Sequence, residues 1–238
     1  MIFMHELDEA GITLACAVTR WSFGDQREDA ITPPEEVARL VEQYPDKLYG
    51  TVAIDGYHIR KSLDIIEKFV VNGPVQAASL EPGMSKHYAD DKELYPLYEY
   101  LSEMDIPLFM MTGGGNGPYI SYTNPEHLDR MLVDFPKLTV IGMHGCVPHA
   151  FEDIMVAFRR RNYFPCPDVY VPDSPFGRIY AEAGNSMIKD QLVFGSAYPL
   201  ITLKEGVDSW MRLPFKESVL ENIMWKNAAR ALKLNWED

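Results

Sequence analysis

Cysteine is scarce in this chain, whose 238 residues include only Cys16, Cys146 and Cys166. An odd number of cysteines at such wide spacing predicts neither a disulfide framework nor a zinc site, so we expect all three thiols to be reduced. Cys146 follows His144 closely, which leaves open a nucleophile activated by histidine. The favoured interpretation is that Cys146 packs as a small hydrophobe.

Long apolar runs and basic residues are also in short supply. No run approaches the roughly 18 uninterrupted apolar residues of a membrane-spanning helix, and the opening stretch MIFMHELDEAG is acidic where a secretory signal is basic. The chain has 22 lysines and arginines against 35 aspartates and glutamates, for a formal net charge of −13. Because nucleic acid and anionic membranes both bind basic surfaces, we expect neither as a partner, and we expect a cytoplasmic location.

What the chain does contain is a regular alternation of short apolar runs and longer amphipathic segments. The apolar runs predict strands at 12–19, 48–54, 75–81, 106–112, 138–144, 168–174 and 191–196. The amphipathic segments predict helices at 33–45, 57–71, 92–104, 124–136, 149–161 and 217–232. Alternation at roughly 25 to 35 residues per unit is typical of βαβ units in a parallel sheet. We expect residues 1–238 to form a single α/β domain.

The number of predicted strands falls one short of a closed barrel. A parallel barrel closes with eight strands, and the first 11 residues here read as a helix instead. We therefore predict an incomplete or distorted TIM (β/α)8-like barrel whose first strand is missing. Strands 12–19 and 191–196 would then border an apolar seam, and we expect a homodimer or larger homo-oligomer to cover it.

Six segments along the chain form an ordered set: HELDEAGI, YPDKLYGTVAID, LYPLYEYLSEMDIPLFMMTGG, FPKLTVIGMHG, LVFGSAYP and NIMWKNAARALKL. In this order they resemble the amidohydrolase-related branch of the amidohydrolase superfamily, which includes metal-dependent decarboxylases of aromatic and muconate-type acids and a lactonase of pyrone dicarboxylates. The segments are spread over nearly the whole chain. The resemblance implies an α/β barrel that acts as a hydrolase or lyase on small carboxylate or lactone substrates.

Departures from the family pattern bear on the metal. The His-X-His pair of the family's first strand has no counterpart in this sequence. The family's fifth-strand histidine falls on Met111, and its strand-end aspartate falls on Ala197. Of the usual ligand and catalytic set only His144 remains. Since a catalytic zinc needs about three nitrogen, sulfur or carboxylate ligands from the protein, we expect no cofactor, with divalent metal weakly bound or absent.

Polar residues at predicted strand ends are the candidates for the site, because the catalytic groups of a parallel barrel emerge there. We predict His144, Glu81 and Asp173 as catalytic residues, one base and two carboxylates whose pKa values burial can separate. The predicted substrate-binding residues are Thr112, Gly113, His87, Ser196 and Tyr198. For His144 the alternative is packing with a hydrogen bond to a neighbouring loop. For the two carboxylates a structural role is the alternative, since both precede turn or cap sequences.

Three functional hypotheses follow. The first is a metal-independent hydrolase or lyase, similar to the family's lactonase or decarboxylases, that uses His144 with a rim carboxylate. The second is a catalytically inactive pseudoenzyme that keeps the barrel for binding a ligand or a partner. The third is a truncated gene model of a metal-dependent hydrolase.

Overall fold

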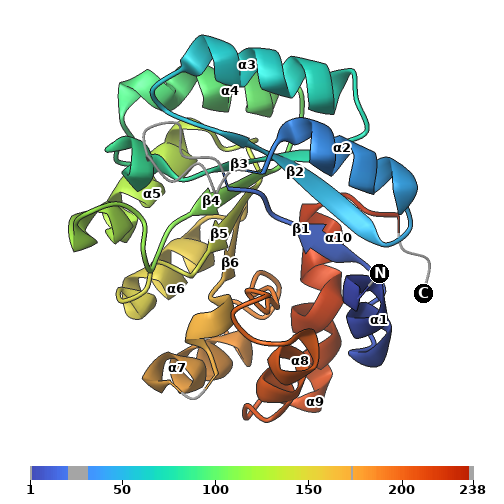
Figure 1. Cartoon of the computed structure of the whole chain (residues 1–238). Coiled ribbons are helices and arrows are strands. Elements are labelled where there is room, and N and C mark those ends of the chain that lie inside the picture. The colour runs from blue at the N-terminus through green and yellow to red at the C-terminus, as the bar shows by residue number, and fades with distance from the viewer. Residues whose placement is uncertain (1, 21–31, 173, 236–238) are drawn as a thin grey trace.

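The framework of the fold is a curled sheet of six parallel strands (Figure 1). The computed structural model describes residues 2–20, 32–172 and 174–235. The strands are β1 (Ala15–Ala17), β2 (Leu48–Ile54), β3 (Ala77–Leu80), β4 (Leu108–Met111), β5 (Val140–Met143) and β6 (Tyr163–Cys166). Each strand pairs in parallel with the next one along the chain. This arrangement confirms the predicted α/β fold of an incomplete TIM-like barrel.

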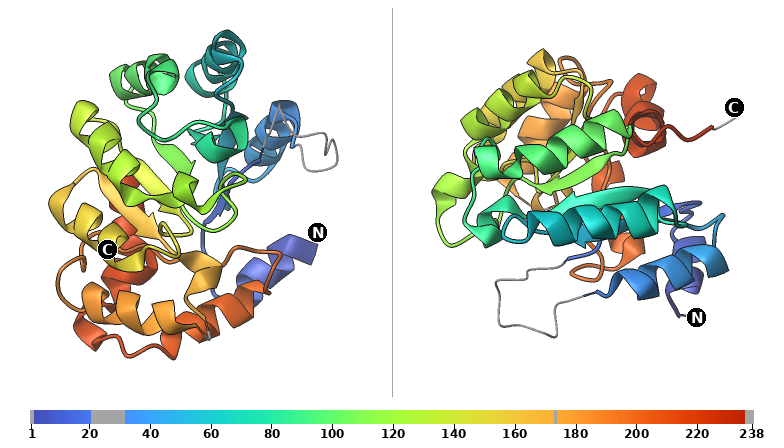
Figure 2. Two further views of the ribbon diagram at one scale, coloured as in Figure 1. Left: turned by 90° about the vertical axis from the view of Figure 1, so that its left-hand side faces the viewer. Right: turned by 90° about the horizontal axis from the view of Figure 1, so that it is seen from above.

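Helices lie around the outside of the curled sheet, as the two further views show (Figure 2). They are α1 (Ile2–Glu9), α2 (Pro34–Gln43), α3 (Ile59–Ile66), α4 (Tyr95–Glu103), α5 (Pro125–Asp134), α6 (Ala150–Arg159), α7 (Pro175–Gly184), α8 (Leu203–Met211), α9 (Glu217–Glu221) and α10 (Asn227–Ala231). One π-helical turn extends α3, and another joins α9 to α10 into the helix predicted at 217–232. Of the helices described, none has the length and apolar character needed to cross a bilayer.

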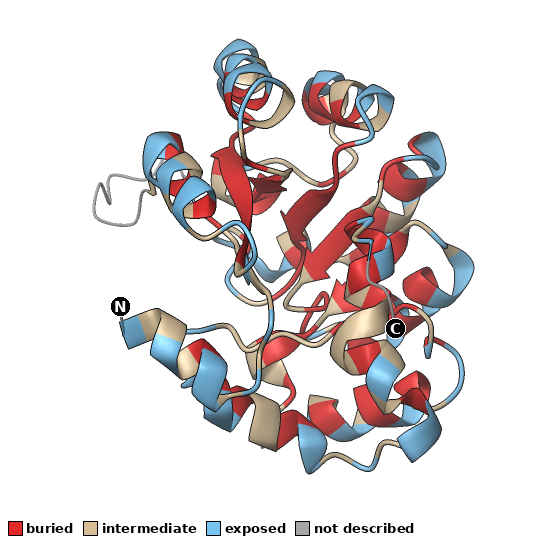
Figure 3. Ribbon diagram, turned by 90° about the vertical axis from the view of Figure 1, so that its right-hand side faces the viewer, coloured by how far each residue is buried: buried red, intermediate tan, exposed pale blue. Residues whose placement is uncertain are grey.

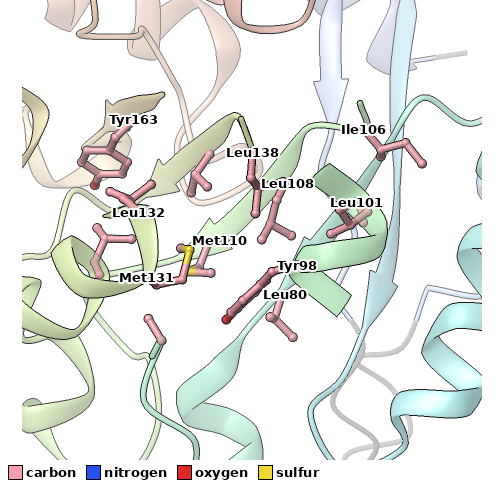
Figure 4. Close-up of a cluster of buried hydrophobic side chains, with 14 of the residues drawn as sticks. Leu80, Tyr98, Leu101, Ile106, Leu108, Met110, Met131, Leu132, Leu138 and Tyr163 are labelled. Carbon is pink, nitrogen blue, oxygen red and sulfur yellow. The ribbon is translucent and has the colours of Figure 1, made fainter. Parts of the chain in front are cut away.

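The main core lies between the sheet and the surrounding helices. The helices have a buried face toward the interior and an exposed face toward solvent (Figure 3). Leu80, Leu108 and Met110 leave the outer face of the sheet and meet side chains of α4 and α5, including Tyr98 and Met131 (Figure 4). All five are fully buried. This layer fixes the positions of the strands and therefore of the residues that follow them.

A second core fills the inside of the curled sheet. Tyr49, Phe109, Ile141 and Phe164 belong to four different strands and cluster there with Val193. The same cluster contains Ala231 and Leu232, at the end of α10. The C-terminal helix therefore contributes to the interior of the barrel as well as to its outside.

Two of the predicted strands are wrong. Residues 168–174 were expected to form one, but the sixth strand is Tyr163–Cys166, and Asp168–Tyr170 is a 3-10 turn. Pro167 explains the break, since proline cannot donate to the ladder and favours turns. The stretch 191–196 is not a regular strand either, although Val193 N donates to the Pro165 carbonyl at 3.0 Å. It follows the edge of β6 without forming a full ladder.

The apolar seam predicted between the two ends of the sheet is at least partly covered by the chain itself. Helix α1, from the N-terminal side, lies against α8, from the C-terminal side (Figure 1). The Phe3 ring also packs against Tyr198, with ring centroids 5.2 Å apart. Contacts within one chain therefore bridge the opening, and the predicted homodimer stays a prediction.

Candidate active site at the carboxyl ends of the strands

Polar side chains follow the strands at one rim of the barrel. Because all strands run parallel, their carboxyl ends meet at the same edge. Thr19 and Arg20 come after β1, Glu81 after β3, His144 after β5 and Asp168 after β6. Asp55, after β2, accepts hydrogen bonds from the backbone amides of Tyr57 and His58 at 2.6 and 2.9 Å and so is occupied at the start of α3.

His144 and Asp168 form a close pair at this rim. The His144 Nδ1 lies 2.8 Å from both carboxylate oxygens of Asp168. The His144 side chain is 19% exposed and that of Asp168 is 8% exposed. The Tyr170 ring meets the imidazole edge to face at 5.3 Å. A proton held on Nδ1 by the carboxylate leaves Nε2 of the neutral imidazole as the basic nitrogen.

The turn that carries His144 has an unusual backbone. His144, Gly145 and Cys146 have φ values of 67°, 50° and 49°, all in the left-handed region. For a residue other than glycine this conformation costs roughly 1–2 kcal/mol, so surrounding contacts must hold it. One such contact is the His144 amide, which donates to the Cys166 carbonyl at 2.9 Å.

Thr112 and Gly113, predicted to bind substrate, support this turn from β4. Thr112 Oγ1 donates to the Met143 carbonyl at 3.0 Å and accepts from the Cys146 amide at 3.3 Å. A Cβ on Gly113 would lie 2.5 Å from the His144 carbonyl oxygen, so only glycine allows this approach. Both residues therefore have a supporting role in the structure, and their contact with substrate stays a prediction.

Glu81, predicted as a catalytic carboxylate, pairs with Arg20. The Arg20 Nε and Nη2 donate to the two Glu81 oxygens at 2.6 and 2.7 Å, the two-pronged geometry that guanidinium and carboxylate favour. The Glu81 side chain is 7% exposed and that of Arg20 is 49% exposed. No side-chain cap by Glu81 is seen on the turn that follows it. Glu81 thus joins two strand ends through an ion pair.

Buried hydroxyl groups anchor the strand end that carries Arg20. The Thr19 amide donates to Thr51 Oγ1 at 2.9 Å, and Ser79 Oγ donates to the Thr19 carbonyl at 2.6 Å. Thr19 Oγ1 donates to the Thr51 carbonyl at 2.8 Å. These bonds tie the chain after β1 to β2 and β3, so Arg20 starts from a fixed backbone.

The other predicted site residues make contacts of their own. His87 Nδ1 is 3.2 Å from Ser85 Oγ, and its ring packs against Tyr57. Ser196 Oγ accepts from the Tyr198 amide at 3.3 Å. Their contact with substrate also stays a prediction. Asp173 lies outside the described residues.

The two residues that sequence reasoning missed are Asp168 and Arg20. Asp168 was assigned to the start of a strand, although its place between two prolines indicates a turn. Arg20 directly follows the first predicted strand, which is the position used to select the other candidates. Cys146 is buried, and burial raises the pKa of its thiol well above the usual value. The core interpretation of Cys146 therefore agrees with the structure.

A comparison with protein families matches nearly the whole chain. The family model described as amidohydrolase matches residues 13–234. The chain belongs to the amidohydrolase family. A search of curated proteins finds no match.

Solved structures match this amidohydrolase over nearly its full length. An uncharacterised TIM-barrel protein from Bordetella bronchiseptica is 37% identical with a TM-score of 0.89, over 97% of this chain and 81% of that one. A 2,6-dihydroxybenzoate decarboxylase from Rhizobium is 15% identical with a TM-score of 0.77, over 98% and 88%. A manganese-bound 5-carboxyvanillate decarboxylase from Novosphingobium aromaticivorans is 15% identical with a TM-score of 0.75, over 98% and 80%. The two decarboxylases show the shared fold alone.

Within the described part of the chain, the donor set at the rim does not fit a divalent metal of the kind bound by the last of these structures. Among the described residues, no three histidine, cysteine, aspartate or glutamate side chains converge on one point. Met111 ends β4 with a buried thioether, and Ala197 offers only a methyl group. The Nδ1 of His144 is already directed at Asp168. A thioether is a poor ligand for manganese or zinc, so these residues would leave the ion short of donors.

Proposed function

We propose that this amidohydrolase is a metal-independent hydrolase or lyase of small carboxylate or lactone substrates. The observation that carries the proposal is the His144–Asp168 pair at the carboxyl end of β5, with Nδ1 held 2.8 Å from the carboxylate. A histidine oriented in this way is suited to general acid–base catalysis near neutral pH.

His144 is the group that moves the proton in this proposal. In the neutral imidazole Nε2 accepts a proton from a water molecule or from the substrate, and the charged ring is stabilised by Asp168. In lactone hydrolysis the hydroxide formed from water adds to the carbonyl carbon, and His144 returns the proton to the alkoxide oxygen as the ring C–O bond breaks. In decarboxylation the C–C bond breaks with release of CO2, and His144 returns the proton taken from the substrate to the carbanion that remains. The Tyr170 ring and the surrounding turn shield the pair from bulk water, which strengthens its electrostatic interaction.

Arg20 and Glu81 bind and orient in this proposal. The half-exposed guanidinium of Arg20 is the kind of group that recognises a carboxylate, and Glu81 fixes its plane. Glu81 thus acts on substrate binding through Arg20, a different role from the catalytic one predicted from the sequence. By analogy with the related decarboxylases, we favour an aromatic or unsaturated acid among the carboxylate substrates.

The test is a substrate screen on purified protein. Lactones and aromatic or unsaturated carboxylic acids are incubated with the enzyme after dialysis against a chelator, and again with added zinc or manganese. The proposal expects turnover of at least one compound without added metal and its loss in His144→Asn. Activity that requires metal refutes it, and binding without any turnover supports the pseudoenzyme hypothesis instead.

A further inference from the structure

A buried carboxyl group outside the proposed machinery lies beneath the turn that carries His144. Asp153, on α6, is completely buried. Its Oδ1 lies 2.6 Å from the Tyr163 hydroxyl of β6, and its Oδ2 lies 2.7 Å from the Tyr180 hydroxyl of α7. The Tyr180 hydroxyl also lies 2.5 Å from the carbonyl oxygen of Gly145. One chain of contacts therefore links α6 to the turn at the active site.

The protons of this cluster can be counted. The Tyr180 hydroxyl has one proton and two close neighbours, Asp153 Oδ2 and the Gly145 oxygen, and an ionised carboxylate and a carbonyl oxygen can only accept. If Asp153 were ionised, one of the two short contacts would hold no proton between its oxygen atoms. If Asp153 is protonated, it donates to Tyr180, which donates to Gly145, and both contacts become hydrogen bonds.

We propose that Asp153 is a neutral carboxylic acid at physiological pH and a positioning residue for His144, acting through Tyr180 and the carbonyl of Gly145. No cation faces the carboxyl, since the titratable groups around it are Tyr163, Tyr180 and Cys146. Burial raises the pKa of the Asp153 carboxyl, and this effect is larger than the lowering of the pKa by the hydrogen bonds of these three groups. The role in positioning rests on the proposed function, whereas the protonation state does not.

Two glycines show how closely this cluster approaches the turn. A Cβ on Gly145 would lie 2.5 Å from the Tyr180 hydroxyl, and one on Gly142 would lie 2.2 Å from the Tyr163 hydroxyl. Both tyrosines therefore fit only because these positions lack a side chain. With Thr112 on the other side, the network holds a turn of three left-handed residues, one of which is His144.

Infrared spectroscopy tests the protonation state without any substrate. A protonated carboxylic acid has a carbonyl stretch distinct from that of a carboxylate, and surface carboxylates are ionised at neutral pH. We expect such a band at about pH 7 in the wild type, its loss in Asp153→Asn and its retention in the matched control Asp168→Asn. Tyr180→Phe removes the acceptor and is expected to shift the band. Absence of the band from the wild-type spectrum, or its loss in Asp168→Asn, overturns the proposal.

Denaturation across pH gives a second readout. With a raised pKa in the folded state, Asp153 keeps a proton that the unfolded chain releases above about pH 4, so stability falls as pH rises through that window. Asp153→Asn has no such proton, and its stability relative to the wild type should rise continuously from about pH 4 past pH 7. A difference that levels off below about pH 6 contradicts the proposal.

Activity measurements separate the positioning role from the proposed function. Asp153→Asn keeps a neutral donor and is expected to retain kcat within a few-fold, whereas Tyr180→Phe breaks the link to Gly145 and is expected to lower kcat about tenfold with KM unchanged. Equal kcat in wild type and Tyr180→Phe refutes the positioning role. If His144→Asn is fully active while the band behaves as expected, the proposed function fails and the protonation state stands.

A different observation, on the outer face of α6, points to a partner. Phe151, Met155 and Phe158 are 69%, 46% and 45% exposed. Their spacing places them in one stripe along the helix, opposite the face that packs on the barrel. Glu152 and Arg159 are exposed on the same side, one near each end. Apolar stripes of this kind on a protein surface mark interaction sites.

We infer that a second copy of this chain packs its α6 antiparallel against this stripe. A two-fold axis near Met155 places each Phe151 beside the partner's Phe158, within about one residue of helical rise. The same axis brings each Glu152 near the partner's Arg159, so that the charges at the two ends are complementary. One helix face is smaller than the roughly 800 Å² per partner of a standard interface, so we expect dissociation in the micromolar range.

Sedimentation equilibrium tests this interface. Met155→Glu places two like charges at the axis and is expected to raise the dissociation constant at least tenfold, whereas the matched control Met211→Glu, at the exposed end of α8, is not. Glu152→Arg and Arg159→Glu should each weaken the dimer, and the double exchange should restore it. A wild type that stays monomeric to about 100 µM, or a dimer unaffected by Met155→Glu, overturns the inference.

Discussion

Two pairs of a carboxylate with a nitrogen base stand at the same rim of the barrel, Glu81 with Arg20 and Asp168 with His144, and the two bases differ in chemistry. In both pairs the carboxylate is nearly buried and its nitrogen partner is more exposed. A guanidinium stays charged at physiological pH, whereas an imidazole also has a neutral form with one nitrogen that can accept a proton. In the proposed function, the same arrangement therefore gives a binding group at β1 and β3 and a proton carrier at β5 and β6.

The largest expected effect is that of His144→Asn, which removes the proton carrier. General acid–base catalysis contributes about 100- to 10,000-fold, so kcat should fall by at least about 100-fold while the fold persists. Steady-state kinetics and a thermal melt measure the two properties. His5→Asn, on the exposed face of α1, is the matched control and should change neither. Turnover retained in His144→Asn would assign this residue to a structural role.

Asp168→Asn should have a smaller effect on the same pair. The amide still accepts from Nδ1, but it supplies no charge to stabilise the imidazolium, so we expect kcat to fall about 10- to 100-fold. Asp129→Asn is the matched control, because Asp129 pairs with Arg160 between α5 and α6, away from the rim. If the two variants have the same kcat, Asp168 does not act on His144, and the contrast drawn between the two rim pairs is wrong.

The binding pair should respond differently. Arg20→Lys replaces a two-pronged contact by a single point charge, so we expect KM to rise about tenfold with kcat nearly unchanged. Glu81→Gln should raise KM less, since Arg20 keeps its charge and loses only its orientation. Arg39→Lys, in a surface pair with Glu36 on α2, should leave KM as it is. A fall in kcat without a change in KM would move Glu81 back to the catalytic role predicted from the sequence.

Whether a residue at the rim could be predicted depended on the sequence immediately around it. His144 and Glu81 follow apolar runs, and the ends of such runs could be read directly. Asp168 was misplaced because the alternation in 168–174 imitates a strand, whereas the two prolines around it force a turn. Arg20 was missed because its partner lies 61 residues away, and a single arginine in sequence reads as an exposed charge.

More of the fold than of the site could be predicted, because strands and helices leave periodic patterns in the sequence and ion pairs do not. Strands β1 to β5 appear within the predicted ranges, and so does the paired helix at the C-terminus. The error in the sixth strand has a local cause, since Pro165 lies inside it and proline argues against a strand. The Asp153 cluster left no pattern at all, because its three members come from three different elements.

The smallest expected effect is that of metal removal. Protein purified without a chelator should hold well under one equivalent of transition metal, and dialysis against a chelator should change kcat by less than about twofold, because Met111 and Ala197 stand where the resemblance to the family implies metal-binding residues. Elemental analysis and kinetics measure both. Stoichiometric zinc or manganese with loss of activity on its removal would contradict this. The double variant Met111→His, Ala197→Asp is a further test of this explanation. Aspartate tolerates the left-handed backbone at position 197, where φ is 52°. The two added donors should raise the amount of bound zinc above that of the wild type.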